Sequence, residues 1–492
     1  MPDNSSLGII FAEYQDRVRE TCVLAQSPPN VNLALIKNHQ MKSCVDQAEL
    51  SSQFDTLVDA TRDEFSVRTV HGDHRLRLSI GNFFRRSGFY LDVFNGSALD
   101  SAEYLQKYEN AFTRDEIEHT IYAPLNYVEF SKRTIDIADF QLVRLSRAEL
   151  DDLFSNRTRE LFWPDRVIDS HLLQEFFFIR VKIKVPRRNS DSRDFVSNVD
   201  FSGRVSELGP AVDPRLEKIL RILCLFPWEN ADSVRKASAD SDDPFQPWFP
   251  CQIPFAIALD DDLLNVPCSA PNLALLATEP DYDSSTGEER DWERKCIATS
   301  FDEAETNEFV SRVSYIAQCY NLIDPLPTEW EFFGIATRFL TKAFIDDETE
   351  QLLWHIVAMD ALLGTPNETK RLAKRIAAVL ESDSSAREKV SQDFIVLYDI
   401  RSKAIHGKPP KKEARLIHLR QARVIARRCT FFVLNCLANL KAECLRLGIS
   451  LPSRDEIIRI LDANPAELDR TKTLLEVMPA GFPHVQEWIR YD

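Results

Sequence analysis

An arginine and a histidine stand five positions apart in residues 397–407, which read Leu-Tyr-Asp-Ile-Arg-Ser-Lys-Ala-Ile-His-Gly. The imidazole of His406 is of a type that titrates near neutral pH, so it can take a proton from a hydroxyl group. Arg401 carries a permanent charge on a planar guanidinium group that can bind a phosphate with two parallel hydrogen bonds. A general base and a charge-stabilising cation are what RNA cleavage by the ribose 2′-OH requires.

A regular helix would not bring these two side chains together, because five residues rotate a side chain by about 140°. The helix can end or distort near Gly407, so that His406 swings back toward Arg401. Alternatively, two copies of the domain can pack about a two-fold axis and line one cleft with both pairs. In a purely structural interpretation, the two side chains only cap the carbonyl groups at the end of a helix.

Residues on both sides of the motif repeat at helical spacing. Upstream, the apolar pattern predicts a helix that stops at Gly364. Thr365, Pro366 and Glu368 then have the arrangement of a capping box that opens the next helix. The pattern predicts an all-α bundle with short connections, whose helices span about 350–363, 366–380, 387–405 and 412–447.

Three segments resemble the HEPN superfamily (higher eukaryotes and prokaryotes nucleotide-binding), and within it the Apea-like HEPN domains. Residues 358–363 resemble the first conserved helix of that family, and residues 371–380 resemble the second. Residues 398–407 match its Tyr-Asp-x-Arg-Ser-Lys-x-x-His-Gly signature nearly letter for letter. The resemblance extends over residues 335–447. One departure is Asp360, which stands where the family has the longer glutamate.

The resemblance implies an endoribonuclease that needs no metal or other cofactor and that works as a homodimer with a shared cleft. His406 would activate the 2′-OH for attack on the adjacent phosphorus, and Arg401 would stabilise the transition state. The products would be a 2′,3′-cyclic phosphate and a free 5′-OH. Ser402, Lys403 and Lys408 would bind the substrate phosphate. The supporting residues would be Asp360, Tyr398 and Asp399.

The resemblance also suggests a biological setting, an anti-phage abortive-infection effector or toxin with RNA as its target. A phage-derived trigger or an antitoxin would then be a partner, including a nucleotidyltransferase that modifies Tyr398 or a nearby residue. The alternative is a non-catalytic HEPN module that binds nucleotides or proteins. The presence of both Arg401 and His406 favours the enzyme.

The net charge of the chain is −17, which by itself disfavours nucleic-acid binding. However, residues 401–430 contain ten basic residues and one acid. This asymmetry predicts a local basic site for RNA, with a solvated helix face as the alternative. Arg420, Arg423 and Arg427 share one helix face, which could follow a phosphate backbone, although a solvated helix face is slightly favoured.

Composition indicates a folded, multidomain chain of 492 residues, with 44% hydrophobic residues and 13 glycines. No run of about 18 apolar residues and no secretory signal occurs, which predicts a cytoplasmic protein without a membrane segment. The ten cysteines form no C-x-x-C pair and read as reduced core thiols. Motifs of ATPases, dinucleotide enzymes, serine hydrolases and zincins do not occur.

The predicted fold class is α+β with several domains. Residues 1–325 are interpreted as a strand-rich mixed α/β sensor or regulatory region, 328–447 as the HEPN helical domain, and 448–492 as a short helical tail. Within the first region, residues 178–185 alternate strictly between apolar and basic side chains and predict a strand. Residues 75–80 and 88–94 are predicted to be further strands.

Overall fold

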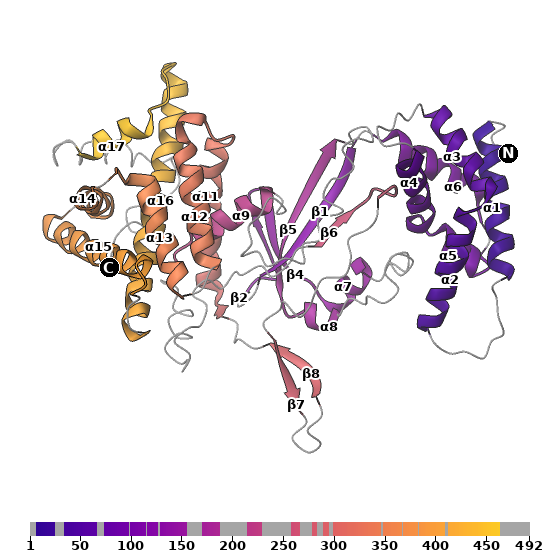
Figure 1. The fold of residues 1–492 in the computed structure, drawn as a ribbon, viewed down its shortest axis with the longest axis horizontal. Helices are drawn as coiled ribbons and strands as arrows, with labels where there is room; N and C mark the ends of the chain where they lie inside the picture. The colour runs from indigo at the N-terminus through magenta and orange to yellow at the C-terminus, as the bar shows by residue number, and fades with distance from the viewer. Residues whose placement is uncertain are drawn as a thin grey trace. The chain divides into compact units, whose positions relative to one another are not determined.

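The fold is known from a computed structural model that describes most of the chain (Figure 1). The described residues are 6–24, 34–65, 73–97, 99–114, 116–125, 128–154, 170–186, 214–228, 257–265, 278–282, 289–294, 299–345, 348–366, 368–381, 383–408 and 412–462. They fall into two compact units. The first consists of Met1–Pro124, Leu142–Arg204 and Ile253–Leu276, and the second of Leu125–Gln141, Val205–Gln252 and Ala277–Asp492.

The first unit begins with a bundle of helices around an aromatic core. Phe11, Tyr14, Phe84 and Tyr108 are fully buried there, and their rings pack against one another. The hydroxyl of Tyr108 shares a hydrogen bond of 2.6 Å with that of Thr61, so its polar end is satisfied inside the core. The helices are α1 (Ser6–Leu24), α2 (Ala34–Glu49), α3 (Ser52–Glu64), α4 (Asp73–Arg86), α5 (Phe89–Phe94) and α6 (Ser101–Thr113).

The predicted strands at 75–80 and 88–94 are wrong, because both segments are helical, in α4 and α5. In α4, Leu76 and Ile80 are buried whereas Leu78 is 50% exposed. A strand facing the core would bury all three, while a helix buries positions four apart. The apparent alternation of residues 75–80 is a short fragment of a helical pattern that continues to buried Phe83 and Phe84. The N-terminal region is therefore mixed but not strand-rich.

A small sheet follows the helices in the first unit. The strands of this sheet that belong to the first unit lie in the order β4-β5-β1-β6, and β1 pairs antiparallel with β6. The strand predicted at 178–185 is confirmed as β5, in which Ile179, Val181 and Ile183 are buried whereas Lys182 and Lys184 are exposed. The elements are β1 (Glu116–Leu125), β4 (Phe140–Arg144), α7 (Arg147–Phe154), α8 (Ser170–Leu173), β5 (Phe177–Pro186) and β6 (Ile257–Asp260).

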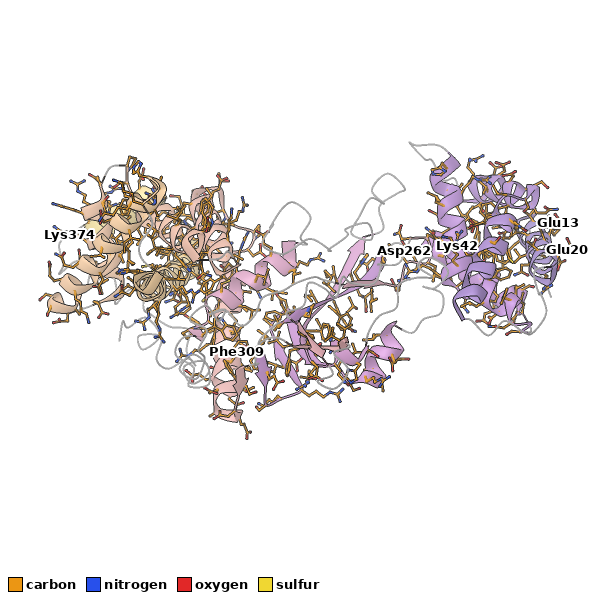
Figure 2. The ribbon with its side chains drawn as sticks, turned by 60° about the horizontal axis from the view of Figure 1, so that its bottom comes forward. Glu13, Glu20, Lys42, Asp262, Phe309 and Lys374 are labelled. Carbon is orange, nitrogen blue, oxygen red and sulfur yellow. The ribbon has the colours of Figure 1, made fainter. Side chains whose placement is uncertain are left out.

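The second unit contains short strands and the helices that carry the motif. Strand β2 pairs parallel with β9, and β7 forms an antiparallel hairpin with β8. Beside β9, Phe226, Trp228 and Phe301 pack around Phe309 of α11, which Figure 2 labels. The strands and first helix are β2 (Val128–Phe130), β3 (Thr134–Ile137), α9 (Pro214–Cys224), β7 (Thr278–Tyr282), β8 (Glu289–Arg294) and β9 (Thr299–Phe301).

The helical bundle of the second unit is built around α16. Helices α11, α12 and α13 pack on α16, as do α14 and α15 (Figure 1). Every described residue of regular structure between 328 and 447 is helical. The helices are α11 (Glu303–Ile323), the 3-10 turn η5 (Thr328–Trp330), α12 (Glu331–Ile345), α13 (Glu348–Leu363), α14 (Thr369–Leu380), α15 (Ser384–Ile405), α16 (Lys412–Leu447) and α17 (Arg454–Asp462).

The bundle includes more than the predicted HEPN segment. Helix α11 lies upstream of residue 328, yet it packs on α16 and the hydroxyl of Tyr315 donates a buried hydrogen bond of 2.5 Å to Asn435 Oδ1. Downstream, the indole of Trp330 donates to the carbonyl oxygen of Pro452 at 2.8 Å. The proposed domain limits at 328 and 447 thus fall inside one compact unit, and they stay a prediction.

The predicted capping box at Thr365 does not form. Helix α14 begins at Thr369 with Glu368 as its N-cap residue, and the Thr365 hydroxyl donates to the Glu368 carboxylate at 2.5 Å instead. Thr365 also accepts a hydrogen bond from Arg375, so its side chain serves a buried arginine rather than a helix terminus. In the described part of the chain, no helix is long and apolar enough to span a membrane.

Candidate functional site

The motif lies at the C-terminal end of helix α15 (Ser384–Ile405). It begins after Asp383, whose carboxylate accepts a hydrogen bond of 2.9 Å from the backbone N–H of Ala386. It ends at Ile405 with His406 as its C-cap residue, after which Gly407 adopts φ +76°. The backbone N–H of Lys408 bonds to the carbonyl of Lys403 at 2.9 Å, and that of Gly407 to the carbonyl of Ala404 at 3.0 Å. This pair of bonds is a Schellman motif, which requires the left-handed conformation that glycine adopts most readily.

Arg401 is held in place by the ring of Tyr398, one helical turn before it. Its guanidinium carbon lies 5.2 Å from the ring centroid, and Nη1 donates to the Tyr398 hydroxyl at 3.3 Å. The Arg401 side chain forms no ion pair with any residue that the structure describes, and its buried Nε has no hydrogen-bond partner among them. Arg401 is thus oriented by stacking while part of its donor capacity stays unused.

The charge of Arg401 affects the pKa of Asp360, a residue near the end of α13. Burial raises the pKa of Asp360, and the positive charges of Arg401 and then Arg454 oppose that shift. Arg401 and Asp360 thus interact electrostatically without a salt bridge between them. Asp360 and Arg401 lie on separate helices, α13 and α15.

His406 is exposed at the end of α15, and the helix has not unwound before it. Its backbone N–H still bonds to the carbonyl of Ser402 at 3.2 Å, the hydrogen bond of a regular helical turn. The rotation of about 140° between Arg401 and His406 is therefore retained. The helix stays regular up to His406, its C-cap residue, and then ends at Gly407.

The predicted phosphate-binding residues occupy different positions around this helix end. Lys403 forms an ion pair of 2.6 Å with Asp399, and both side chains are more than half exposed. Such exposed pairs contribute little stability. Asp399 contacts this lysine rather than Arg401 or His406. Lys408 is exposed on the turn after the helix, and Ser402 is half-buried.

Several basic side chains within residues 401–430 are buried and do not belong to the protein surface. Arg423, Arg427 and Arg428 are only 7%, 2% and 4% exposed. Arg423 donates to Gln351 of α13, and burial, followed by the neighbouring Arg420, lowers its pKa well below the ordinary value. The predicted solvated or phosphate-tracking face is therefore wrong for Arg423 and Arg427. Arg420 is exposed, and the side chains of Lys411 and Lys412 lie outside the described residues.

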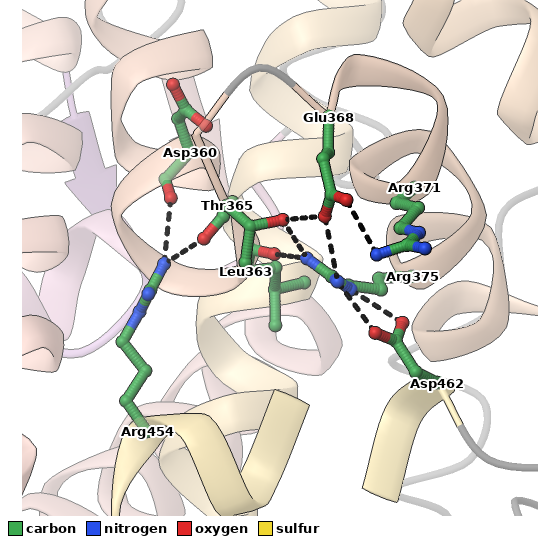
Figure 3. Close-up of polar contacts among 9 residues, drawn as sticks. Asp360, Leu363, Thr365, Glu368, Arg371, Arg375, Arg454 and Asp462 are labelled. Atoms are coloured by element: carbon green, nitrogen blue, oxygen red, sulfur yellow. Dashed lines mark hydrogen bonds and ion pairs between the residues drawn. The ribbon is translucent and has the colours of Figure 1, made fainter. Parts of the chain in front are cut away.

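Two other arginines donate hydrogen bonds to carbonyl oxygens at the end of α13 (Figure 3). The sequence patterns did not predict these contacts. Arg375 of α14 is 2% exposed and donates to the carbonyl of Leu363 at 2.8 Å. Arg454 of α17 donates to the carbonyl oxygens of Ala361, Asp360 and Gly364 at 3.1, 3.2 and 2.5 Å. Cations at a helix C-terminus stabilise its unpaired carbonyl groups. The arginines come from distant parts of the chain, so no local signal predicts these contacts.

No family model matches the chain, and comparison with curated proteins and with solved structures found no match either.

Proposed function

We propose that this protein is a metal-independent endoribonuclease, with Arg401 and His406 as its catalytic residues. His406 takes the proton of a ribose 2′-OH as that oxygen attacks the adjacent phosphorus. The 5′-oxygen of the next nucleotide leaves, and the chain is cut into a 2′,3′-cyclic phosphate and a free 5′-OH. Arg401 stabilises the negative charge that develops on the phosphoryl oxygens.

The observation that carries the proposal is how the Arg401 side chain is held within residues 398–407. A half-buried guanidinium that is stacked on Tyr398 but not neutralised by an ion pair keeps its charge for a ligand. His406 lies at the exposed helix end, where a substrate can reach its imidazole. The signature resemblance supplies the chemistry that would use both groups.

The proposed working form is a homodimer whose two copies of α15 share one cleft. The helical rotation between Arg401 and His406 supports this arrangement, since each arginine would act with the histidine of the partner copy. Exposed apolar side chains on the same helix, Val396 and Ile405, are 47% and 57% exposed in the single chain and are available to such an interface. In a cell, the proposed activity is that of an anti-phage effector or toxin.

The decisive experiment incubates the purified protein with total RNA and transfer RNA in EDTA and maps the ends of the fragments. We expect cyclic phosphate and 5′-OH ends, and we expect Arg401→Ala and His406→Ala each to abolish cleavage. Arg459→Ala is a suitable control, because that arginine is exposed on α17, outside the motif. Cleavage that survives both motif substitutions, or that requires added Mg²⁺, would contradict the proposal. RNA binding without cleavage would favour the non-catalytic module.

A further inference from the structure

Helix α12 presents an outer face on which cations stand beside apolar side chains. Four residues lie at positions i, i+3, i+4 and i+7, so they share one side of the helix. They are Ile335, Arg338, Phe339 and Lys342, and each is exposed or half-buried. Residues 332–345 contain these two cations and no acid. The α12 face therefore combines positive charge with apolar surface that solvent reaches.

An aromatic stack joins the α12 face to α13, which packs along α12. The rings of Phe339 and Trp354 are nearly parallel, with an interplanar angle of 7° and centroids 5.5 Å apart. The ammonium group of Lys342 lies 4.1 Å from the centroid of the Trp354 ring. Such a contact orients the lysine and the ring without neutralising the charge. Both rings remain only half-buried.

The charges of Arg338 and Lys342 are not neutralised within the described part of the chain, where neither forms an ion pair. Lys107 of α6 provides a contrast, because it also lies over an aromatic ring, at 5.1 Å from the centroid of Tyr104. Its ammonium group, however, pairs with Glu103 at 2.5 Å. Lys342 thus keeps its charge and its N–H donors for a ligand.

We infer that the α12 face and Trp354 form a second contact surface for RNA, on which an unpaired base stacks while the flanking phosphates bind Arg338 and Lys342. Aromatic side chains beside cations bind single-stranded nucleic acid without reading its sequence. In a double helix the bases are stacked on one another, so this surface prefers single-stranded RNA. The inference rests on the proposed ribonuclease function and deepens it, since it makes the substrate an RNA with an unpaired segment.

The stacking test measures the affinity of the full chain for an unstructured RNA of about 12 nucleotides. It is made in the His406→Ala background, so that the RNA stays intact. Phe339→Leu should lower the affinity between about fivefold and a hundredfold, the loss of one stacked base. Phe339→Tyr, which keeps an aromatic ring, should retain it. Phe112→Leu is the matched control, because Phe112 stacks on Phe65 in the first unit at 5.2 Å and 9°.

Two results of this test would overturn the inference. One is an unchanged affinity in Phe339→Leu, and the other is an equal loss in Phe112→Leu. An RNA duplex serves as a second probe, since it offers phosphates without an unpaired base. Its binding should not respond to Phe339→Leu, and an equal loss there would show a general disturbance of the bundle and would also overturn the inference.

The charge test uses Arg338→Met and Lys342→Met with the same single strand. Each should lower the slope of log affinity against log salt by about 0.7, the value for one phosphate contact with a single strand. Lys107→Met is the control, because it removes a lysine from over a ring in the first unit and should leave the slope unchanged. An unchanged slope in both α12 variants rejects the phosphate contacts and with them the inference.

Cleavage assays separate the inference from the function on which it rests. With His406 present, Phe339→Leu should raise KM and change kcat little, because it removes binding that lies outside the catalytic pair. A protein that cuts RNA with the same KM and affinity in Phe339→Leu overturns the inference and leaves the ribonuclease intact. A protein that cuts no RNA but loses single-strand affinity in Phe339→Leu supports the surface and rejects the ribonuclease.

Discussion

Arg375 and Asp462 form a two-pronged ion pair across 87 positions of sequence, with Nε and Nη2 of the arginine each 2.7 Å from a carboxylate oxygen. The guanidinium is almost fully buried, and its remaining Nη1 donates to Leu363 and Thr365. The pair joins α14 to the last residue of α17 and so encloses the end of α13.

Substitution Asp462→Ala should destabilise the helical bundle by about 1–3 kcal/mol, because it leaves a buried cation with two donors unpaired. The effect falls short of the largest known for buried pairs, since Asp462 is 38% exposed and Glu368 lies 3.8 Å from the same guanidinium. Urea unfolding measures the change. Asp455→Ala, at an exposed position of the same helix, is the control. A loss below about 0.5 kcal/mol at position 462 would show that the pair is not important for folding.

His355 should make stability depend on pH. Burial, followed by the charge of Arg423, lowers the pKa of His355 well below 6.5. The unfolded chain therefore binds a proton that the folded chain excludes, so stability is complete above about pH 6.5 and is lost as the pH falls below that value. Urea midpoints across pH 5–8 test this dependence.

His355→Leu is expected to flatten that dependence and to leave stability at pH 7.5 unchanged or higher. Neither ring nitrogen of His355 has a hydrogen-bond partner among the described residues, so an apolar side chain loses no bond there. An unchanged slope in the leucine variant would assign the pH dependence to another group.

Gly407→Ala should lower stability by about 1 kcal/mol, because φ +76° is a left-handed conformation that alanine adopts at a cost. It should also slow RNA cleavage, since the same turn fixes the end of the helix at His406. Gly448 provides a matched control at φ +66° after α16, with open space around its Cβ position as at Gly407. Gly448→Ala should cost similar stability but leave cleavage unchanged. If both substitutions slowed cleavage equally, the turn at Gly407 would have no specific role in catalysis.

Lys408→Ala should weaken RNA binding without moving the cut sites, because phosphate contacts position the nucleic acid but do not read its sequence. The slope of log affinity against log salt should fall by roughly 0.7 to 1 unit for the lost contact. Lys389, exposed near the start of α15, serves as a control that should change neither quantity. An unchanged slope in Lys408→Ala would mean that the turn remains in solvent when RNA binds.

Helical periodicity predicted the long elements of the second unit well. The bounds of α16 agree with the prediction, because its apolar pattern extends over ten turns and proline residues precede it. The same approach failed for α4, where six residues with alternating arginine and leucine resembled a strand. A short window cannot separate a period of 2 from a period of 3.6 when the decisive residues, Phe83 and Phe84, lie just beyond it.

The candidate site was predictable as a set of residues but not as an arrangement. Tyr398, Arg401 and His406 are close in sequence, so the helix alone relates them. Burial of Arg423 and Arg427 could not be anticipated, because a count of charges treats every arginine as exposed. The contacts of Arg454 and Asp462 depend on how the chain returns to α13 after α16, which no local pattern specifies.

The ion pair at Asp462 also sets how short a working helical fragment of this protein can be. A fragment that stops at Leu447 would lose Arg454 and Asp462. The guanidinium of Arg375 would then be without its ion-pair partner Asp462. One that starts at residue 328 would lose α11 and the hydrogen bond from Tyr315 to Asn435. A fragment suited to expression on its own therefore has to contain α11 through Asp462, together with the segments carrying Phe226, Trp228 and Phe301 that pack on Phe309 of α11.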